Sequence, residues 1–187
     1  AARALRALAA LADAPERKAE LVWRLGELHL RQGDVEAADD EFLRASDLDP
    51  GHVPTLRRLI DVYWHADEPP LLLDVATDLA QRGELLGDAT DPATLGRALI
   101  AASASGAMNL AASIAAHLGD GAAVAVAVAL TEIDERHREL TLDACATALR
   151  ELARKGQGPG VLAVIDEVAE LVDEEHADAI ATALTGA

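Results

Sequence analysis

The residues that could support catalysis or bind a metal ion are scattered along the chain. The six histidines fall one to a predicted helix or turn, and no two are four residues apart: His29, His52, His65, His117, His137 and His176. A metal site on a single helix needs ligands on one face, as in the HExxH motif. That motif is absent, as are the CxxC and GxSxG motifs of redox and hydrolytic sites. We therefore expect no metal site, no cofactor and no enzymatic activity.

Three other features whose residue types could support chemistry have structural explanations. The glycine-rich run 156–160 follows a predicted helix rather than a strand, and it lacks the GxGxxG spacing of a phosphate-binding loop. The adjacent carboxylates of Asp39 and Asp40 are typical of a solvated helix face. The single cysteine, Cys145, excludes an intrachain disulfide and is expected to pack as a small hydrophobic side chain.

The composition favours an all-helical protein. Of the 187 residues, 51% are hydrophobic but only 2% are aromatic, so the core must be built largely from Ala, Leu, Val and Ile. Such side chains suit closely packed helices, whereas β-sandwiches draw on aromatic and β-branched residues. The length allows one compact domain or a short array of repeats.

The charge balance restricts the class of partner. The chain has 16 basic and 33 acidic residues, a formal net charge of −17. This charge would repel phosphate backbones and anionic membrane surfaces, so we expect no nucleic-acid partner and no membrane partner. The expected partner is a neutral or basic protein or peptide.

Two features bear on location. The stretch Ala98–Leu118 carries no formal charge, but Gly106 divides it, and Asn109, Ser113 and His117 recur every four residues on one stripe. This pattern predicts an amphipathic helix in water rather than a membrane span. The chain shows no signal-peptide pattern, and its Ala-rich, Lys-poor composition is typical of a GC-rich bacterial genome. We expect a piece of a larger protein of the bacterial cytoplasm.

A helical hairpin is predicted for residues 19–52. Apolar residues recur at helical spacing on both sides of a break at Gly33–Asp34, and Gly26 would allow the two helices to cross closely. The positions on the facing sides of the two helices are Val22, Leu25, His29, Ala38, Phe42 and Ala45. Pro50–Gly51 closes the unit.

Three capping patterns predict where helices begin. Asp34 is a favourable N-cap for the second helix of the hairpin. Asp13 and Glu16 have the spacing of a capping box for the first helix. Asp91 is an N-cap followed by Pro92 at the first position of a later helix.

The hairpin resembles a tetratricopeptide repeat (TPR). The residues that match the family's pattern are Val22, Leu25, Gly26, His29, Ala38, Phe42 and Pro50. The chain departs from the pattern at Val22, where Trp is typical, and at His29, where Tyr is typical. The resemblance implies an all-α fold, a right-handed α-solenoid of antiparallel helix pairs. It also implies that the first helices of successive repeats line a concave groove, which binds an extended or helical peptide.

The neighbouring segments extend the resemblance. Residues 53–86 form a less regular repeat, in which Ile60 replaces the glycine and Pro69–Pro70 opens the second helix. Residues 1–13 resemble the second helix of a truncated repeat. We therefore expect a TPR-like domain over residues 1–86.

Beyond residue 87 the motif is lost, but breaks continue at a similar spacing. They predict degenerate helix pairs at 92–118, 121–155 and 159–186, within a second region, 87–187. Its acidic C-terminal end is expected to act as a solubilising cap. The alternating valines of Ala122–Leu130 could suit a strand, but we expect a helix because no second strand-like run is present to pair with it.

The resemblance places candidate binding residues on the outward stripes of the two first helices. These groove candidates are Glu20, Trp23, Glu27, Leu30, Arg31, Arg57, Asp61, Trp64 and His65. Trp and Arg are frequent anchors of interfaces, although each Trp could instead pack beneath an adjoining repeat. Repeats that clamp a chaperone's C-terminal carboxylate use Lys and Asn at positions that Trp23 and Glu27 occupy here, so that ligand is not expected.

The expected function is that of a non-catalytic scaffold that binds a protein or peptide segment in a concave groove. One alternative is architectural self-association, as in a homodimer, through the Ala-rich region 92–131 with the groove empty. Another is a regulatory domain of a larger enzyme or transcription regulator.

Overall fold

The computed structural model describes residues 1–87 and 89–118. Within these ranges every regular element is an α-helix and no strand occurs, which confirms the predicted all-α class for this part of the chain. The chain divides into two compact units, Ala1–Glu84 and Leu85–Ala187, called unit 1 and unit 2 below. The helix pairs predicted at 121–155 and 159–186, and with them the run Ala122–Leu130, lie outside the described residues.

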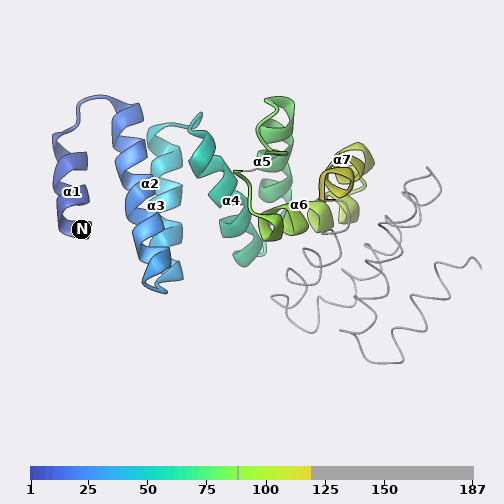
Figure 1. The fold of residues 1–187 in the computed structure, drawn as a ribbon, viewed down its shortest axis with the longest axis horizontal. Helices are drawn as coiled ribbons and strands as arrows, with labels where there is room; N and C mark the ends of the chain where they lie inside the picture. Colours follow the sequence, from blue (N-terminus) through green and yellow to red (C-terminus); the bar gives the residue numbers. More distant parts are fainter. Residues whose placement is uncertain (88, 119–187) are drawn as a thin grey trace, which may run out of the picture. The chain divides into compact units, whose positions relative to one another are not determined.

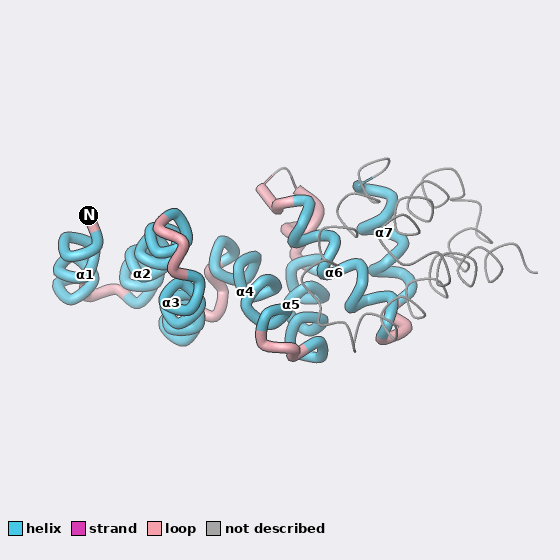
Figure 2. The backbone as a smooth tube through the Cα atoms, turned by 90° about the horizontal axis from the view of Figure 1, so that it is seen from below, coloured by secondary structure: helices cyan, strands magenta, loops and turns pink. Residues whose placement is uncertain are grey.

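Unit 1 consists of five consecutive helices. They are α1 (Ala2–Leu11), α2 (Pro15–Arg31), α3 (Val35–Leu48), α4 (Val53–His65) and α5 (Pro69–Gln81). Each helix packs chiefly against the helices before and after it in the chain, as Figure 1 shows in blue to green. Figure 2 shows the same order from below. Antiparallel neighbours joined by short turns therefore make up the unit.

The α2–α3 hairpin has the core that the sequence predicts. Leu25 on α2 and Ala38, Phe42 and Ala45 on α3 are almost wholly buried. Gly26 lies directly beneath the Phe42 ring, because a Cβ added to it would come within 2.6 Å of Cε1 of that ring. The predicted close crossing at Gly26 is thus confirmed, and the missing side chain makes room for the aromatic ring.

The α4–α5 hairpin repeats this burial pattern 34 residues later. The pairs of buried residues at this spacing are Leu21 and Thr55, Val22 and Leu56, Leu25 and Leu59, Gly26 and Ile60, Ala38 and Leu72, Phe42 and Ala76, and Ala45 and Leu79. Even the turns correspond, because Gly33 has φ +76° and Asp67, at the equivalent place, has φ 55°. The sizes are exchanged between the hairpins, because Gly26 and Phe42 in the first correspond to Ile60 and Ala76 in the second.

The capping predictions have mixed outcomes. The Asp34 carboxylate accepts a hydrogen bond from the Ala37 N–H at 3.3 Å, which confirms Asp34 as the N-cap of α3. The capping box at Asp13 is wrong, since Ala14 is the N-cap of α2 and no side chain caps that helix. Pro15 explains the difference, because proline favours the first helical position and keeps the residue before it extended.

Unit 2 contains the helix pair predicted at 92–118. Its helices are α6 (Pro92–Ala104) and α7 (Met108–Leu118), separated by Gly106 with φ +77°. Asp91 caps α6 through a 2.8 Å hydrogen bond from the Ala93 N–H, as predicted. In the described part of the chain, no helix combines the length and the apolarity needed to cross a membrane.

Candidate functional site

An ion pair joins the C-terminal half of α2 to the middle of α4. The Glu27 carboxylate accepts hydrogen bonds from Nε of Arg58 at 2.6 Å and from Nη2 at 3.2 Å. Nη1 of the same guanidinium lies 3.6 Å from the Asp61 carboxylate, one turn further along α4. Arg58 therefore holds one carboxylate from each helix and links the two helices through their side chains.

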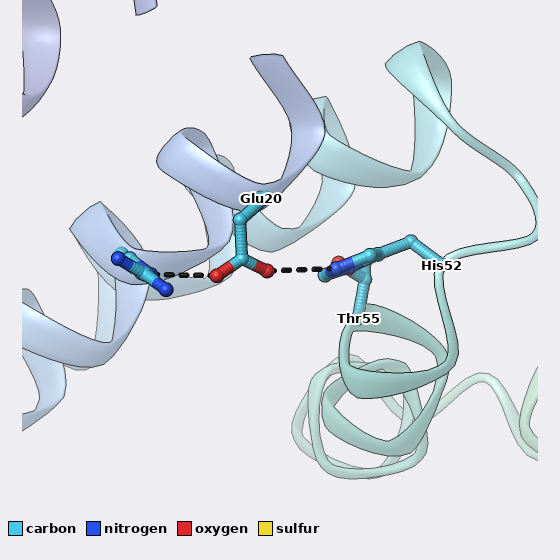
Figure 3. A network of polar contacts seen from close by, with 4 residues as sticks. Glu20, His52 and Thr55 are labelled. Carbon is cyan, nitrogen blue, oxygen red and sulfur yellow. Dashed lines mark hydrogen bonds and ion pairs between the residues drawn. The ribbon is translucent and has the colours of Figure 1, made fainter. Parts of the chain in front are cut away.

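A second polar network joins the N-terminal half of α2 to the start of α4, as Figure 3 shows. Nε2 of His52 lies 3.1 Å from the Glu20 carboxylate, and its Nδ1 lies 2.7 Å from the hydroxyl of the buried Thr55. A ring protonated on Nε2 would donate to Glu20 and accept from Thr55. Arg24, one turn along α2, donates to the other Glu20 oxygen at 2.6 Å. The two networks together align the outward stripes of α2 and α4.

Trp23 lies between these networks and is only partly exposed. Its ring meets the His52 ring edge to face, with 6.0 Å between centroids and 67° between planes. The indole N–H is buried and has no hydrogen-bond partner. A buried indole N–H usually has a partner, so the Trp23 N–H is an exception within a residue that is partly exposed overall.

The other groove candidates differ in their surroundings. Leu30 and Trp64 are partly exposed, and Arg31 and His65 are exposed. Arg57 points along the helix array rather than toward α2, because it donates to the Glu84 carbonyl at 2.9 Å and to the Glu84 carboxylate at 2.9 Å. The structure thus brings the α2 candidates Glu20 and Glu27 to α4, and it places Arg57 on the α5 side.

Asp39 on α3 borders the C-terminal end of α4. Burial raises the pKa of its carboxyl above the ordinary value of 3.8. The positive charge of His65 opposes the increase in pKa, while the negative charges of Asp61 and Asp40 add to it. The predicted solvated face therefore holds for Asp40, which is exposed, whereas Asp39 is partly buried.

Two residues that organise the site, Arg58 and His52, were not among the sequence candidates. The spacing of Arg58 and Asp61 indicates a pair on one helix face. The partners across the helices, Glu27 for Arg58 and Glu20 for His52, are 31 and 32 residues away. Because this separation is close to one repeat, alignment of successive repeats is the signal that could have found them.

The carboxylates between α2 and α4 are engaged by neighbouring side chains. The Glu20 and Glu27 carboxylates are each hydrogen-bonded to a cation or an imidazole across the helices. Within residues 1–87 and 89–118, no three His, Cys, Asp or Glu side chains come together in a way that could hold a metal ion. Beside these hydrogen-bonded carboxylates lies the partly exposed residue Trp23.

Comparison with known proteins adds no relative: no family model matches the chain, and neither a curated protein nor a solved structure matches it significantly.

Proposed function

We propose that the chain is a non-catalytic protein-interaction module of TPR-like helix pairs, stacked as a right-handed α-solenoid. The observation that carries this proposal is the 34-residue repetition of burial and of turn geometry in unit 1. A helix pair of this kind cannot bury its apolar side alone, so successive pairs stack and present their first helices on one surface. In this chain those first helices are α2 and α4.

The binding surface of the proposal is the shared face of α2 and α4, called the α2–α4 face below. The ion pair between Glu27 and Arg58 and the contact between His52 and Glu20 keep the two outward stripes in register. Trp23 and Trp64 are both partly exposed, and such aromatic side chains are typical anchors of protein interfaces. A preformed surface also lowers the entropy lost on binding.

The ligand of the proposal is a neutral or basic protein segment with an apolar anchor. The net charge of −17 would steer a cationic segment toward the chain. Because Arg58 and Arg24 already pair with Glu27 and Glu20, we place the apolar anchor, and not a buried salt bridge, at the centre of recognition. A bacterial cytoplasmic location belongs to the same proposal.

The test is selection of short random peptides displayed on a cell surface against the intact chain. Each round would be counter-selected against the Trp23→Ala/Trp64→Ala double variant, so that only peptides that need the two indoles survive. The proposal expects enriched sequences that share an apolar residue and a neutral or positive charge. Failure to enrich any peptide over the counter-selection, with a folded double variant, would contradict it.

A further inference from the structure

Unit 1 contains a cleft that the α2–α4 face does not use. It lies between α1, α2 and α3 and has a volume of about 390 Å³. Sites for small molecules typically have volumes of roughly 300–1,000 Å³. The cleft is therefore large enough for one small organic molecule.

The lining of the cleft has a simple chemistry. Seven of its side chains are aliphatic and three are cationic: Leu5, Ala9, Ala10, Leu21, Val22, Leu25 and Leu48, with Arg6, Lys18 and Arg44. Three of the aliphatic residues, Leu21, Val22 and Leu25, belong to the buried core and form a fixed apolar floor of the cleft. No acidic, hydroxyl, amide or aromatic side chain lines this cleft.

The three cations stand out in so acidic a chain. Residues 1–24 contain five basic and three acidic residues, whereas the remaining residues contain eleven and thirty. Arg6 lies 3.3 Å from the His29 ring, and Arg44 lies 3.5 Å from the Glu41 carboxylate while remaining 63% exposed. Among the described residues, Lys18 has no ion-pair partner. Little of the positive charge at the cleft is therefore neutralised by the protein.

We infer that this cleft binds a single-chain aliphatic carboxylate, with the alkyl chain on the leucine and valine floor and the carboxylate among Arg6, Lys18 and Arg44. A peptide is the poorer occupant. Its backbone N–H and C=O groups would lose water against aliphatic side chains that offer no hydrogen bond, which costs free energy. An alkyl chain brings no such groups.

The helix α1 gives the cleft an adjustable wall. None of its residues is fully buried, and Leu8 and Leu11 are 52% and 79% exposed. Elements with few buried contacts shift at low cost in free energy. Movement of α1 can therefore fit alkyl chains of different length without disturbing the core of α2 and α3.

The inference is tested by titrating the intact chain with dodecanoate, below the concentration at which it forms micelles, in an isothermal calorimeter. We expect saturable binding of one molecule per chain. Dodecyltrimethylammonium, which has the same tail and a positive head, should not bind in this way. Equal binding of both amphiphiles would overturn the inference, as would the absence of dodecanoate binding.

Variants locate the site. Lys18→Glu should weaken dodecanoate binding by about tenfold or more, since an opposed charge replaces an attractive one. Arg17→Glu is the matched control, because it makes the same charge change at an exposed neighbour outside the cleft, and it should have little effect. Equal losses in the two variants would mean general charge attraction and would overturn the inference.

A third variant tests the apolar part of the cleft. Ala10 is exposed and lines the cleft, so Ala10→Trp should fill it and abolish dodecanoate binding without loss of thermal stability. Trp23→Ala should leave dodecanoate binding unchanged, because Trp23 lies outside the lining. Binding that survives Ala10→Trp but is lost in Trp23→Ala would place the carboxylate on the α2–α4 face and overturn the inference. The proposed peptide-binding function would not be affected by that result.

Discussion

Arg58 on α4 donates two hydrogen bonds to the Glu27 carboxylate on α2, at 2.6 and 3.2 Å, across the two first helices of successive hairpins. Burial lowers the pKa of the Arg58 guanidinium, but the hydrogen bond and the charge of Glu27, together with Asp61, outweigh that effect and raise it overall. The side chains remain 33% and 20% exposed. Arg58 therefore remains positively charged at every physiological pH, within an ion pair that is partly buried.

The first prediction concerns this ion pair. Arg58→Ala leaves the partly buried carboxylates of Glu27 and Asp61 without their shared cation, so we expect a loss of about 1–3 kcal/mol in the free energy of unfolding. Urea denaturation followed by circular dichroism measures it. Arg82→Ala is the control, because its pair with Asp78 is 42% exposed on both sides and should contribute less than about 1 kcal/mol. Equal losses in the two variants would mean that the ion pair adds nothing beyond a surface pair.

The second prediction concerns the crossing of α2 and α3. Gly→Ala in a helix usually stabilises by about 1 kcal/mol, but a Cβ at position 26 would lie within 3.0 Å of three Phe42 ring atoms. Phe42 is only 1% exposed, so its ring can shift only by displacing other buried atoms. We expect Gly26→Ala to destabilise the fold by about 1–3 kcal/mol, as overpacking does.

A double-mutant cycle identifies the cause. If the Phe42 ring is the obstacle, Gly26→Ala should cost much less in a Phe42→Leu background than in the original chain. Thermal unfolding of the four proteins gives the coupling free energy. A cost that is the same in both backgrounds would assign the effect to another neighbour.

The third prediction compares two aspartates that the sequence makes equivalent. Asp34 caps α3 through the Ala37 N–H, whereas Asp13 caps nothing because Pro15 places the N-cap at Ala14. Asp34→Ala should therefore cost about 1 kcal/mol, and Asp13→Ala should change stability by less than about 0.5 kcal/mol. Chemical denaturation of both variants checks the difference, and a larger loss for Asp13→Ala would contradict it.

Local patterns explain which parts of the fold were predictable. The Gly26–Phe42 crossing and the Asp34 cap depend on residues within one hairpin. There, helical spacing alone determines which side chains lie on the facing sides of the two helices. The capping box at Asp13 failed because two local signals competed, and the backbone restriction of Pro15 outweighed the spacing of Asp13 and Glu16.

The site was less predictable because it depends on how helices are rotated against one another. Successive residues on a helix point about 100° apart, so Arg57 and Arg58 cannot face the same neighbour. The sequence favoured Arg57 for the groove, but Arg58 meets Glu27 and Arg57 meets Glu84. Which arginine meets Glu27 depends on how α4 is rotated relative to α2. That rotation follows from the packing of whole hairpins rather than from spacing along one helix.

The fourth prediction concerns pH. Because burial raises the pKa of Asp39 in the folded state, ionised Asp39 lowers stability. Protonated Asp39 contributes to the free energy of unfolding. This contribution is fully present below the ordinary pKa of 3.8, and it is lost as the pH rises through the higher pKa of the folded state. We expect Asp39→Asn to raise the melting temperature at pH 7, by an amount that shrinks toward zero below pH 3.8.

Melting curves across this pH range provide the check. Asp40→Asn is the matched control, since its side chain is exposed beside Asp39 on α3 and should give a much smaller gain at pH 7. A gain in Asp39→Asn that is constant at all pH values would come from packing of the amide and not from removal of a charge.

The central claim is that the α2–α4 face binds a protein segment through its indoles. We expect Trp23→Ala and Trp64→Ala each to weaken a selected peptide by about 2 kcal/mol or more, the range of interface hot spots. Association should slow as salt rises, because electrostatic steering is screened beyond a Debye length of roughly 8 Å at physiological ionic strength.

The most direct measurement compares affinity and stability in the same variants, by calorimetric titration with a selected peptide and by urea unfolding. For Trp23→Ala the account predicts a large loss of affinity and a loss of stability well below that of Leu25→Ala, a core truncation expected to cost about 2–5 kcal/mol. The contradictory result is Trp23→Ala as unstable as Leu25→Ala, with unchanged affinity per folded molecule. Trp23 would then belong to the core, and the α2–α4 face would not be the binding surface.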